Sequence, residues 1–206
     1  MADAVTDRWD RIAEYYDQLV QRYGHDPRAC DYGKPESQQV KFKVLSEVGS
    51  IRGRTILDIG CGFADFAVYL SAQFPGVHYS GIDLCASMIE RAQRQHPELD
   101  LKIGNILEAS PGAHFDFVTA NGIFYLLGDD AWLTMKSLIE RMYSLANLAV
   151  AFNSLSSWAS GQEKGEFYAD PLQTVEYCRT LTPWVVLRHD YHPRDFTVYI
   201  YRTANG

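Results

Sequence analysis

Two glycines stand where a strand is expected to meet a helix, and one carboxylate stands near the end of that strand and another at the end of the next strand. Asp58 lies within the β-branched run 55–59, Gly60 and Gly62 follow this run, and Asp83 comes about twenty residues later, at the end of the next apolar run. Glycine lets the backbone approach a ligand closely, and a carboxylate at the end of a second strand can accept both hydroxyls of a ribose. The spacing therefore predicts a site for a nucleoside-containing cofactor.

The same turn is poorly suited to phosphate. A dinucleotide fingerprint needs a small residue at its third glycine position, where this chain has Asp65, and no Lys or Arg stands in the turn. The Gly-Lys-Ser/Thr of a phosphate-binding loop is also absent. Asp58 adds negative charge where a cationic ligand would be favoured. We therefore expect a site for a sugar and a cation, and a nicotinamide-dependent oxidoreductase is the disfavoured alternative.

The segment Asp58-Ile59-Gly60-Cys61-Gly62-Phe63-Ala64 resembles the glycine-rich signature of class I S-adenosylmethionine-dependent methyltransferases. The last glycine of the family pattern is replaced by Ala64, a mild departure if that position mainly serves packing. The resemblance extends over nearly the whole chain. It implies S-adenosyl-L-methionine as the cofactor, a Rossmann-like fold and a methyltransferase activity.

Further segments resemble the family in order along the chain. Ile82-Asp83-Leu84 with Ser87-Met88 resembles the ribose and adenine segment, Gly104-Asn105-Ile106 the segment beside the adenine amine, and 115–121 the strand beside the methionine moiety. Tyr15-Tyr16-Asp17 resembles a helix that covers the cofactor. Together these implied cofactor residues are Tyr16, Asp58, Gly60, Cys61, Gly62, Asp83, Leu84, Met88, Asn105, Ile106, Asn121 and Gly122.

Candidates for the catalytic step follow from the strand ends that share an edge with the cofactor. His189 is a candidate base because histidine is the residue type whose unperturbed pKa suits that role, and Asp190 follows it, although both could instead tie down a hairpin by hydrogen bonds. Asn153 could orient the acceptor or cap a strand end. Side chains that could cover the cofactor or line an acceptor pocket are Tyr16, Tyr23, Tyr125, Trp158 and Tyr168.

Two further features of the sequence bear on the chemical class of the methyl acceptor. Asp129 and Asp130 are better explained as helix-capping carboxylates than as magnesium ligands, so we expect no metal site. The Asn-Pro-Pro-Tyr tetrad of enzymes that methylate nucleobase amines or protein amides is absent, since Asn121-Gly122-Ile123-Phe124 stands in its place. We therefore expect a small-molecule acceptor methylated on O or N. Protein or RNA methylation and a non-catalytic cofactor-binding module remain alternatives.

Strands and helices alternate along the chain, which predicts βαβ units and a mostly parallel sheet. The expected strands are 55–59, 77–82, 99–103, 115–120, 148–152, 184–187 and 196–201, and the expected helices are 7–22, 37–48, 65–74, 86–95, 129–145 and 171–180. The connection 188–195 is too short for a parallel crossover, so the last two strands should form an antiparallel hairpin. The predicted fold is an α/β, seven-stranded Rossmann-like sheet with helices on both faces.

The chain of 206 residues favours one domain, 1–206, with residues 1–50 as a helical lid and 51–206 as the cofactor-binding core with acceptor-pocket insertions. A net charge of −7 disfavours a nucleic-acid partner. The first residues lack a signal peptide and no apolar run could span a membrane, so a cytoplasmic protein is expected, as a monomer or homodimer. The four cysteines show no CxxC pair and are expected as buried thiols.

Overall fold

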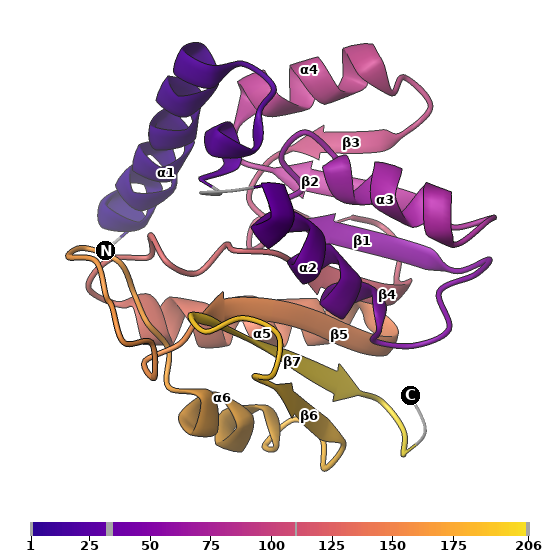
Figure 1. Ribbon diagram of the computed structural model, residues 1–206, viewed down its shortest axis with the longest axis vertical. Helices are drawn as coiled ribbons and strands as arrows, with labels where there is room; N and C mark the ends of the chain where they lie inside the picture. Colours follow the sequence, from indigo (N-terminus) through magenta and orange to yellow (C-terminus); the bar gives the residue numbers. More distant parts are fainter. Residues whose placement is uncertain (1, 32–34, 110, 205–206) are drawn as a thin grey trace.

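The computed structural model describes residues 2–31, 35–109 and 111–204, and its centre is one seven-stranded sheet (Figure 1). The strand order is β3-β2-β1-β4-β5-β7-β6. β1 through β5 pair in parallel, whereas β7 runs antiparallel to both β5 and β6. The bounds are β1 Thr55–Ile59, β2 His78–Asp83, β3 Asp100–Ile103, β4 Phe115–Ala120, β5 Ala146–Leu155, β6 Val185–Arg188 and β7 Asp195–Tyr201. The predicted parallel sheet with its antiparallel finish is confirmed.

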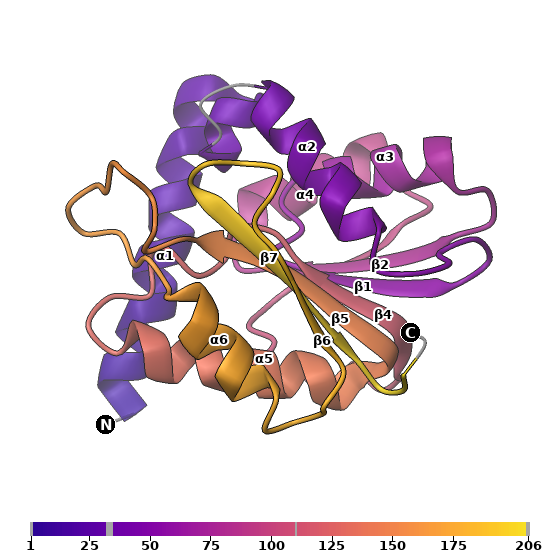
Figure 2. The same ribbon diagram turned by 60° about the horizontal axis from the view of Figure 1, so that its bottom comes forward.

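In the described part of the chain, five helices cover the two faces of this sheet (Figure 2). One face carries α2 Pro35–Ser46, α3 Asp65–Gln73 and α4 Ala86–Gln95, and the opposite face carries α5 Ala131–Leu145 and α6 Pro171–Cys178. Each face has its own apolar cluster: Phe42, Phe66 and Ile89 represent the first, and Met135 and Phe152 the second. Burial of both sheet faces explains why β1, β4 and β5, in the middle of the sheet, are buried along most of their length.

The sixth helix, α1 Ala2–Tyr23, lies across the end of the sheet instead of on a face (Figures 1 and 2). Its apolar positions recur at helical spacing, with Trp9 and Val20 buried. A short 3-10 turn, η1 Pro27–Cys30, follows. None of the helices in the described part of the chain is long and apolar enough to cross a membrane.

Several predicted boundaries are corrected by the structure. α1 begins before residue 7, α2 begins at Pro35 instead of residue 37, and residues 27–30, where no helix is predicted, form η1. β5 extends beyond 148–152 because it is paired on both sides, by β4 and β7. Asp130 stands at the N-terminal cap of α5, but its carboxylate accepts no bond from the helix amides and lies 3.7 Å from Arg8 instead.

Candidate functional site

The sheet reverses its strand order between β1 and β4, which is where ligands bind in open α/β sheets. The turn from β1 into α3 lies at this point and begins with Gly60, whose φ is +73°. A Cβ atom added at Gly60 would lie 2.3 Å from Cγ2 of Ile123. Glycine is therefore required here both by the backbone angle and by the loop that follows β4.

Asp83 at the end of β2 fixes the second half of the glycine turn. One carboxylate oxygen accepts the Gly62 amide at 2.7 Å, and the other accepts the Cys85 amide at 2.8 Å. Burial raises the pKa of Asp83, although the amide hydrogen bonds work against that shift. A carboxylate has about four lone-pair sites, so two remain for the hydroxyls of a ribose.

Asp58 is buried beside this turn at 3% exposure. Its carboxylate accepts hydrogen bonds from the Tyr79 hydroxyl at 2.7 Å and from the Thr119 hydroxyl at 2.8 Å. Desolvation is the largest effect and raises the pKa of Asp58 to about 7. A nearby cation would favour the ionised form of this carboxylate.

The position of the missing third glycine has a backbone requirement that the sequence interpretation overlooked. Ala64 has a φ of +61°, in the left-handed region, and is fully buried at the start of α3. Replacing glycine by alanine here therefore costs backbone strain as well as changing packing.

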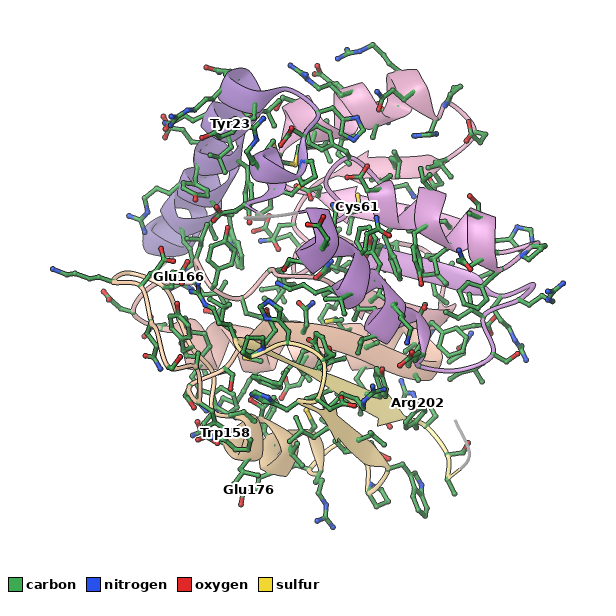
Figure 3. The ribbon with its side chains drawn as sticks, in the orientation of Figure 1. Tyr23, Cys61, Trp158, Glu166, Glu176 and Arg202 are labelled. Carbon is green, nitrogen blue, oxygen red and sulfur yellow. The ribbon has the colours of Figure 1, made fainter. Side chains whose placement is uncertain are left out.

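All of the predicted cofactor residues lie around one cavity, the first cavity, beside the β1–α3 turn. They are Tyr16, Asp58, Gly60, Cys61, Gly62, Asp83, Leu84, Met88, Asn105, Ile106, Asn121 and Gly122. Figure 3 shows Cys61 beside α3, below α4 in this view. The sequence thus predicted the members of a real cavity, which residues distant in the chain build together.

The chemistry of the first cavity suits a cationic nucleoside. Asp58, Asp65 and Asp83 line it, and no Lys, Arg or His of the described residues does. Trp9 also lines it, and its buried indole Nε1 has no hydrogen-bond partner among the described residues. S-adenosylmethionine fits this donor and acceptor set, with its ribose at Asp83 and its positive charges among carboxylates. A pyrophosphate does not fit.

Asn105, predicted beside the adenine, is held by its own turn. Its Oδ1 accepts the Leu107 amide at 3.0 Å, and its Nδ2 lies 3.2 Å from a Glu108 carboxylate oxygen. The side chain therefore shapes the turn after β3 at the cavity wall.

A second cavity lies on the outer side of the first, between α1, α2 and the segments 154–166 and 191–195. Gly122 and Tyr125 line both cavities, so the two meet at these residues. Eight acidic or basic side chains line the second cavity: Asp31, Glu36, Lys41, Glu163, Glu166, His192, Arg194 and Asp195. Figure 3 shows Glu166 in the loop beside α1.

A buried charge cluster forms one wall of the second cavity. Lys41 Nζ lies 2.9 Å from Oδ1 of Asp195, and Nδ1 of His192 lies 2.5 Å from Oδ2 of the same carboxylate. Desolvation lowers the pKa of His192 despite the neighbouring Asp195. Asp195 begins β7, and because β7 is antiparallel, its first residue lies at the edge where the parallel strands end. The predicted antiparallel hairpin already implied that the start of its second strand lies at this edge, but His192 and Asp195 were not named as candidates from the sequence.

The predicted catalytic residues line neither cavity. His189 Nε2 lies 2.7 Å from the Ser156 hydroxyl, and its ring stacks on Trp158. Asp190 pairs with Arg188 at 2.8 Å rather than with His189. Both follow β6, the outermost strand, about four strand spacings or roughly 20 Å from β1.

Asn153 acts on the loop that closes the first cavity. It is fully buried on β5, its Oδ1 accepts the Gly122 amide at 2.7 Å, and its Nδ2 donates to Oδ1 of Asn121 at 2.5 Å. Of the predicted acceptor walls, Tyr125 lines the second cavity. Tyr168 does not line it, but its hydroxyl is hydrogen-bonded to three residues that do, namely Glu163, Glu166 and Arg194.

Comparisons with known proteins agree with this geometry. Residues 56–145 match the family model described as a methyltransferase domain. A Mycobacterium tuberculosis protein named only as a candidate methyltransferase is 27% identical over 157 residues, 73% of this chain and 94% of the relative. The trans-aconitate 2-methyltransferase of Mycobacterium sp. (strain KMS) is 27% identical over 149 residues, 72% of this chain. That match spans only 53% of the relative, so the chain spans about half the length of this relative.

Solved structures share the fold. The magnesium protoporphyrin IX methyltransferase of Synechocystis PCC 6803, solved with bound S-adenosylhomocysteine, superposes with a TM-score of 0.69 at 13% identity, covering 95% of this chain and 100% of that one. The complex of DhpI with S-adenosylmethionine gives 0.68 at 17% identity, covering 92% and 95%.

Proposed function

We propose that this chain is a class I S-adenosylmethionine-dependent methyltransferase that transfers the methyl group to an O or N atom of a small molecule by in-line displacement. The observation that carries this proposal is the junction of the two cavities at Gly122 and Tyr125. A cofactor in the first cavity and an acceptor in the second would meet there.

Different residues of the first cavity would bind different parts of the cofactor. Asp83 would bind the ribose, Ile106 and Leu84 would pack on the adenine, and the carboxylates would attract the positive charges. When bound, S-adenosylmethionine supplies a sulfonium methyl group that is already activated for transfer. The protein therefore has to align the acceptor with the methyl group and to exclude water. Alignment alone can lower the activation barrier by roughly 7–11 kcal/mol.

Alignment depends on the loop after β4. Asn153 holds the Gly122 amide and the Asn121 side chain from within β5, so the loop is positioned by a buried, rigid strand. We therefore assign Asn153 a positioning role at the junction instead of contact with the acceptor.

His192 is the side chain we propose as proton acceptor where the methylated atom must lose a proton. It lines the second cavity, beside Asp195, and its lowered pKa keeps the imidazole neutral near pH 7. An acceptor that is already anionic, such as a carboxylate, would need no base.

Calorimetric titration with S-adenosylhomocysteine and with NADH tests the cofactor. We expect binding of the first and none of the second, and the reverse result would overturn the proposal. Transfer of labelled methyl groups from S-adenosylmethionine to small-molecule acceptors then tests the activity. The panel should include trans-aconitate, because a relative is named for it, together with phenols and amines. Cofactor binding without transfer to any acceptor in a complete metabolite extract would favour a non-catalytic module.

A further inference from the structure

Four oxygen-bearing side chains form a continuous chain of hydrogen bonds where the two cavities meet. The hydroxyls of Tyr15 and Tyr125 both donate to Oδ2 of Asp31, each at 2.9 Å. The hydroxyls of Tyr16 and Tyr125 lie 2.8 Å apart. We refer to Tyr16, Tyr125 and Asp31 as the oxygen chain; Tyr15 is a side branch at its outer end.

The direction of each proton in the oxygen chain follows from counting donors. A phenol has one proton, and burial raises the pKa of Tyr16 and of Tyr125, so both remain protonated. The proton of Tyr125 is given to Asp31, so Tyr16 must donate to Tyr125. No hydroxyl proton of the chain is left for a ligand, and the carboxylate polarises both phenols in the same sense. What the chain can offer a ligand is oxygen lone pairs.

The oxygen chain runs from one cavity into the other. Tyr16 and Tyr125 line the first cavity, and Tyr125 and Asp31 line the second. Since Tyr125 stands at the junction, a methyl group on its way from cofactor to acceptor must pass beside it. The positive sulfur that carries this methyl group would then lie near electron-rich oxygen.

We propose that the oxygen chain makes the cofactor site selective for charge, so that it binds the sulfonium of S-adenosylmethionine in preference to the neutral thioether of S-adenosylhomocysteine. This inference rests on the proposed function, because it requires the cofactor to lie in the first cavity. The two ligands differ by one methyl group and one positive charge. Lone pairs polarised by a carboxylate stabilise that charge and gain nothing from the product.

The backbone around Asp31 is fixed by the short turn that precedes it, although Asp31 itself is exposed. The Asp26 carboxylate accepts the Arg28 amide at 3.0 Å, and Pro27 begins η1. Asp31 then ends η1 with a φ of +59°, a conformation that Asp and Asn tolerate better than other side chains. Asp31→Asn therefore removes the charge and leaves the backbone requirement satisfied.

The experiment measures dissociation constants of S-adenosylmethionine and of S-adenosylhomocysteine for the full chain and four variants. Asp31→Asn and Tyr16→Phe should each weaken S-adenosylmethionine binding by about fivefold and change S-adenosylhomocysteine binding by less than about twofold. Tyr15→Phe makes the same chemical change as Tyr16→Phe on a residue outside the first cavity, and should preserve the wild-type ratio. Asp129→Asn matches the charge change of Asp31→Asn at an exposed site outside both cavities.

Equal weakening of both ligands in Asp31→Asn and Tyr16→Phe would overturn the inference, because it would mean that the oxygen chain only holds α1 and η1 in place. Unchanged affinity for S-adenosylmethionine would overturn it as well. Failure of the wild-type chain to bind either ligand would instead remove the proposed function, so the two failures are distinguishable. Thermal unfolding of each variant establishes that the binding data come from folded protein.

Discussion

Ala64 shows how a single residue can depart from a glycine pattern at little cost. The left-handed backbone costs an alanine about 1–2 kcal/mol. Two terms offset that cost: the buried methyl group contributes roughly 0.8 kcal/mol, and the loss of glycine's freedom in the unfolded chain contributes about 0.4–1 kcal/mol. The small net effect explains why alanine is accepted in this turn.

Ala64→Gly should therefore change the free energy of unfolding by less than about 1 kcal/mol. Ala64→Val should lower it by more than about 2 kcal/mol, because a β-branched side chain is strained at positive φ and the site is fully buried. Urea denaturation of both variants measures the difference. A valine variant as stable as wild type would show that the turn adopts another conformation.

His189 and His192 form a matched pair for testing the base. They flank Tyr191, but only His192 lines the second cavity. With an acceptor that must lose a proton, His192→Gln should lower kcat by about 10²–10⁴-fold and leave the KM for S-adenosylmethionine unchanged. Activity of the wild type should rise as pH increases through the His192 pKa, which lies below its usual value. His189→Gln should retain most of the activity, and the opposite result would restore His189 as the predicted base.

Asp58 gives the pH dependence of stability a definite sign. Its pKa is about 7 in the folded protein and near 3.8 in the unfolded chain, so the folded state keeps a proton that the unfolded state releases between these values. The stability from this group is therefore fully present below about pH 4 and is lost as pH rises towards 7. The total is on the order of 4 kcal/mol.

Asp58→Asn removes this titration. The difference in unfolding free energy between Asp58→Asn and wild type should rise steadily in favour of the variant from pH 4 to pH 7. Chemical denaturation at several pH values measures it, and taking the difference cancels groups that both proteins share. A difference independent of pH would mean that Asp58 stays ionised.

At the scale of elements, the sequence was most informative where function depends on consecutive segments. The glycine turn and Asp83 belong to neighbouring βα units, and parallel strands joined by a right-handed crossover lie side by side, so their proximity could be predicted. Tyr16 and Asn105 were placed at the same cavity only because the chain resembles a family.

The proposed base, His192, could not be placed in the same way. The predicted hairpin located His189 at the correct edge of the sheet, but strand order across the sheet is not written in local patterns. In the order β5-β7-β6, β6 is an edge strand, so the residues after it lie far from the cofactor cavity. β7 lies next to β5, so its first residue, Asp195, and the nearby His192 lie at the second cavity. Asp31 was missed for a related reason, since its position depends on η1, a short turn between two predicted helices.

At the scale of the whole molecule, α1 is attached differently from the other helices. Among the described residues, Trp9 is its only buried member of the two large apolar clusters, and the partly buried Ile12 packs against the same cluster. Val20 belongs to a small separate cluster with Ala29, Phe63, Cys85 and Met88. Polar contacts complete the attachment, including Asp17 with Ser87 at 2.5 Å and Tyr16 with Tyr125. α1 can therefore leave the sheet with most of the core intact.

This attachment predicts that α1 opens to admit the cofactor and closes over it. Backbone amides of α1 should exchange with deuterated solvent faster than those of β1 and β4 in the ligand-free protein, because local opening costs less than global unfolding. S-adenosylhomocysteine in excess should slow exchange in α1 by a factor that rises with ligand concentration, since only the closed form completes the first cavity. Amides of α6, which lines neither cavity, serve as the internal control. If exchange in α1 were as slow as in the central strands, or if saturating ligand left it unchanged, α1 would be a fixed part of the core and the cofactor would have to enter by way of the second cavity.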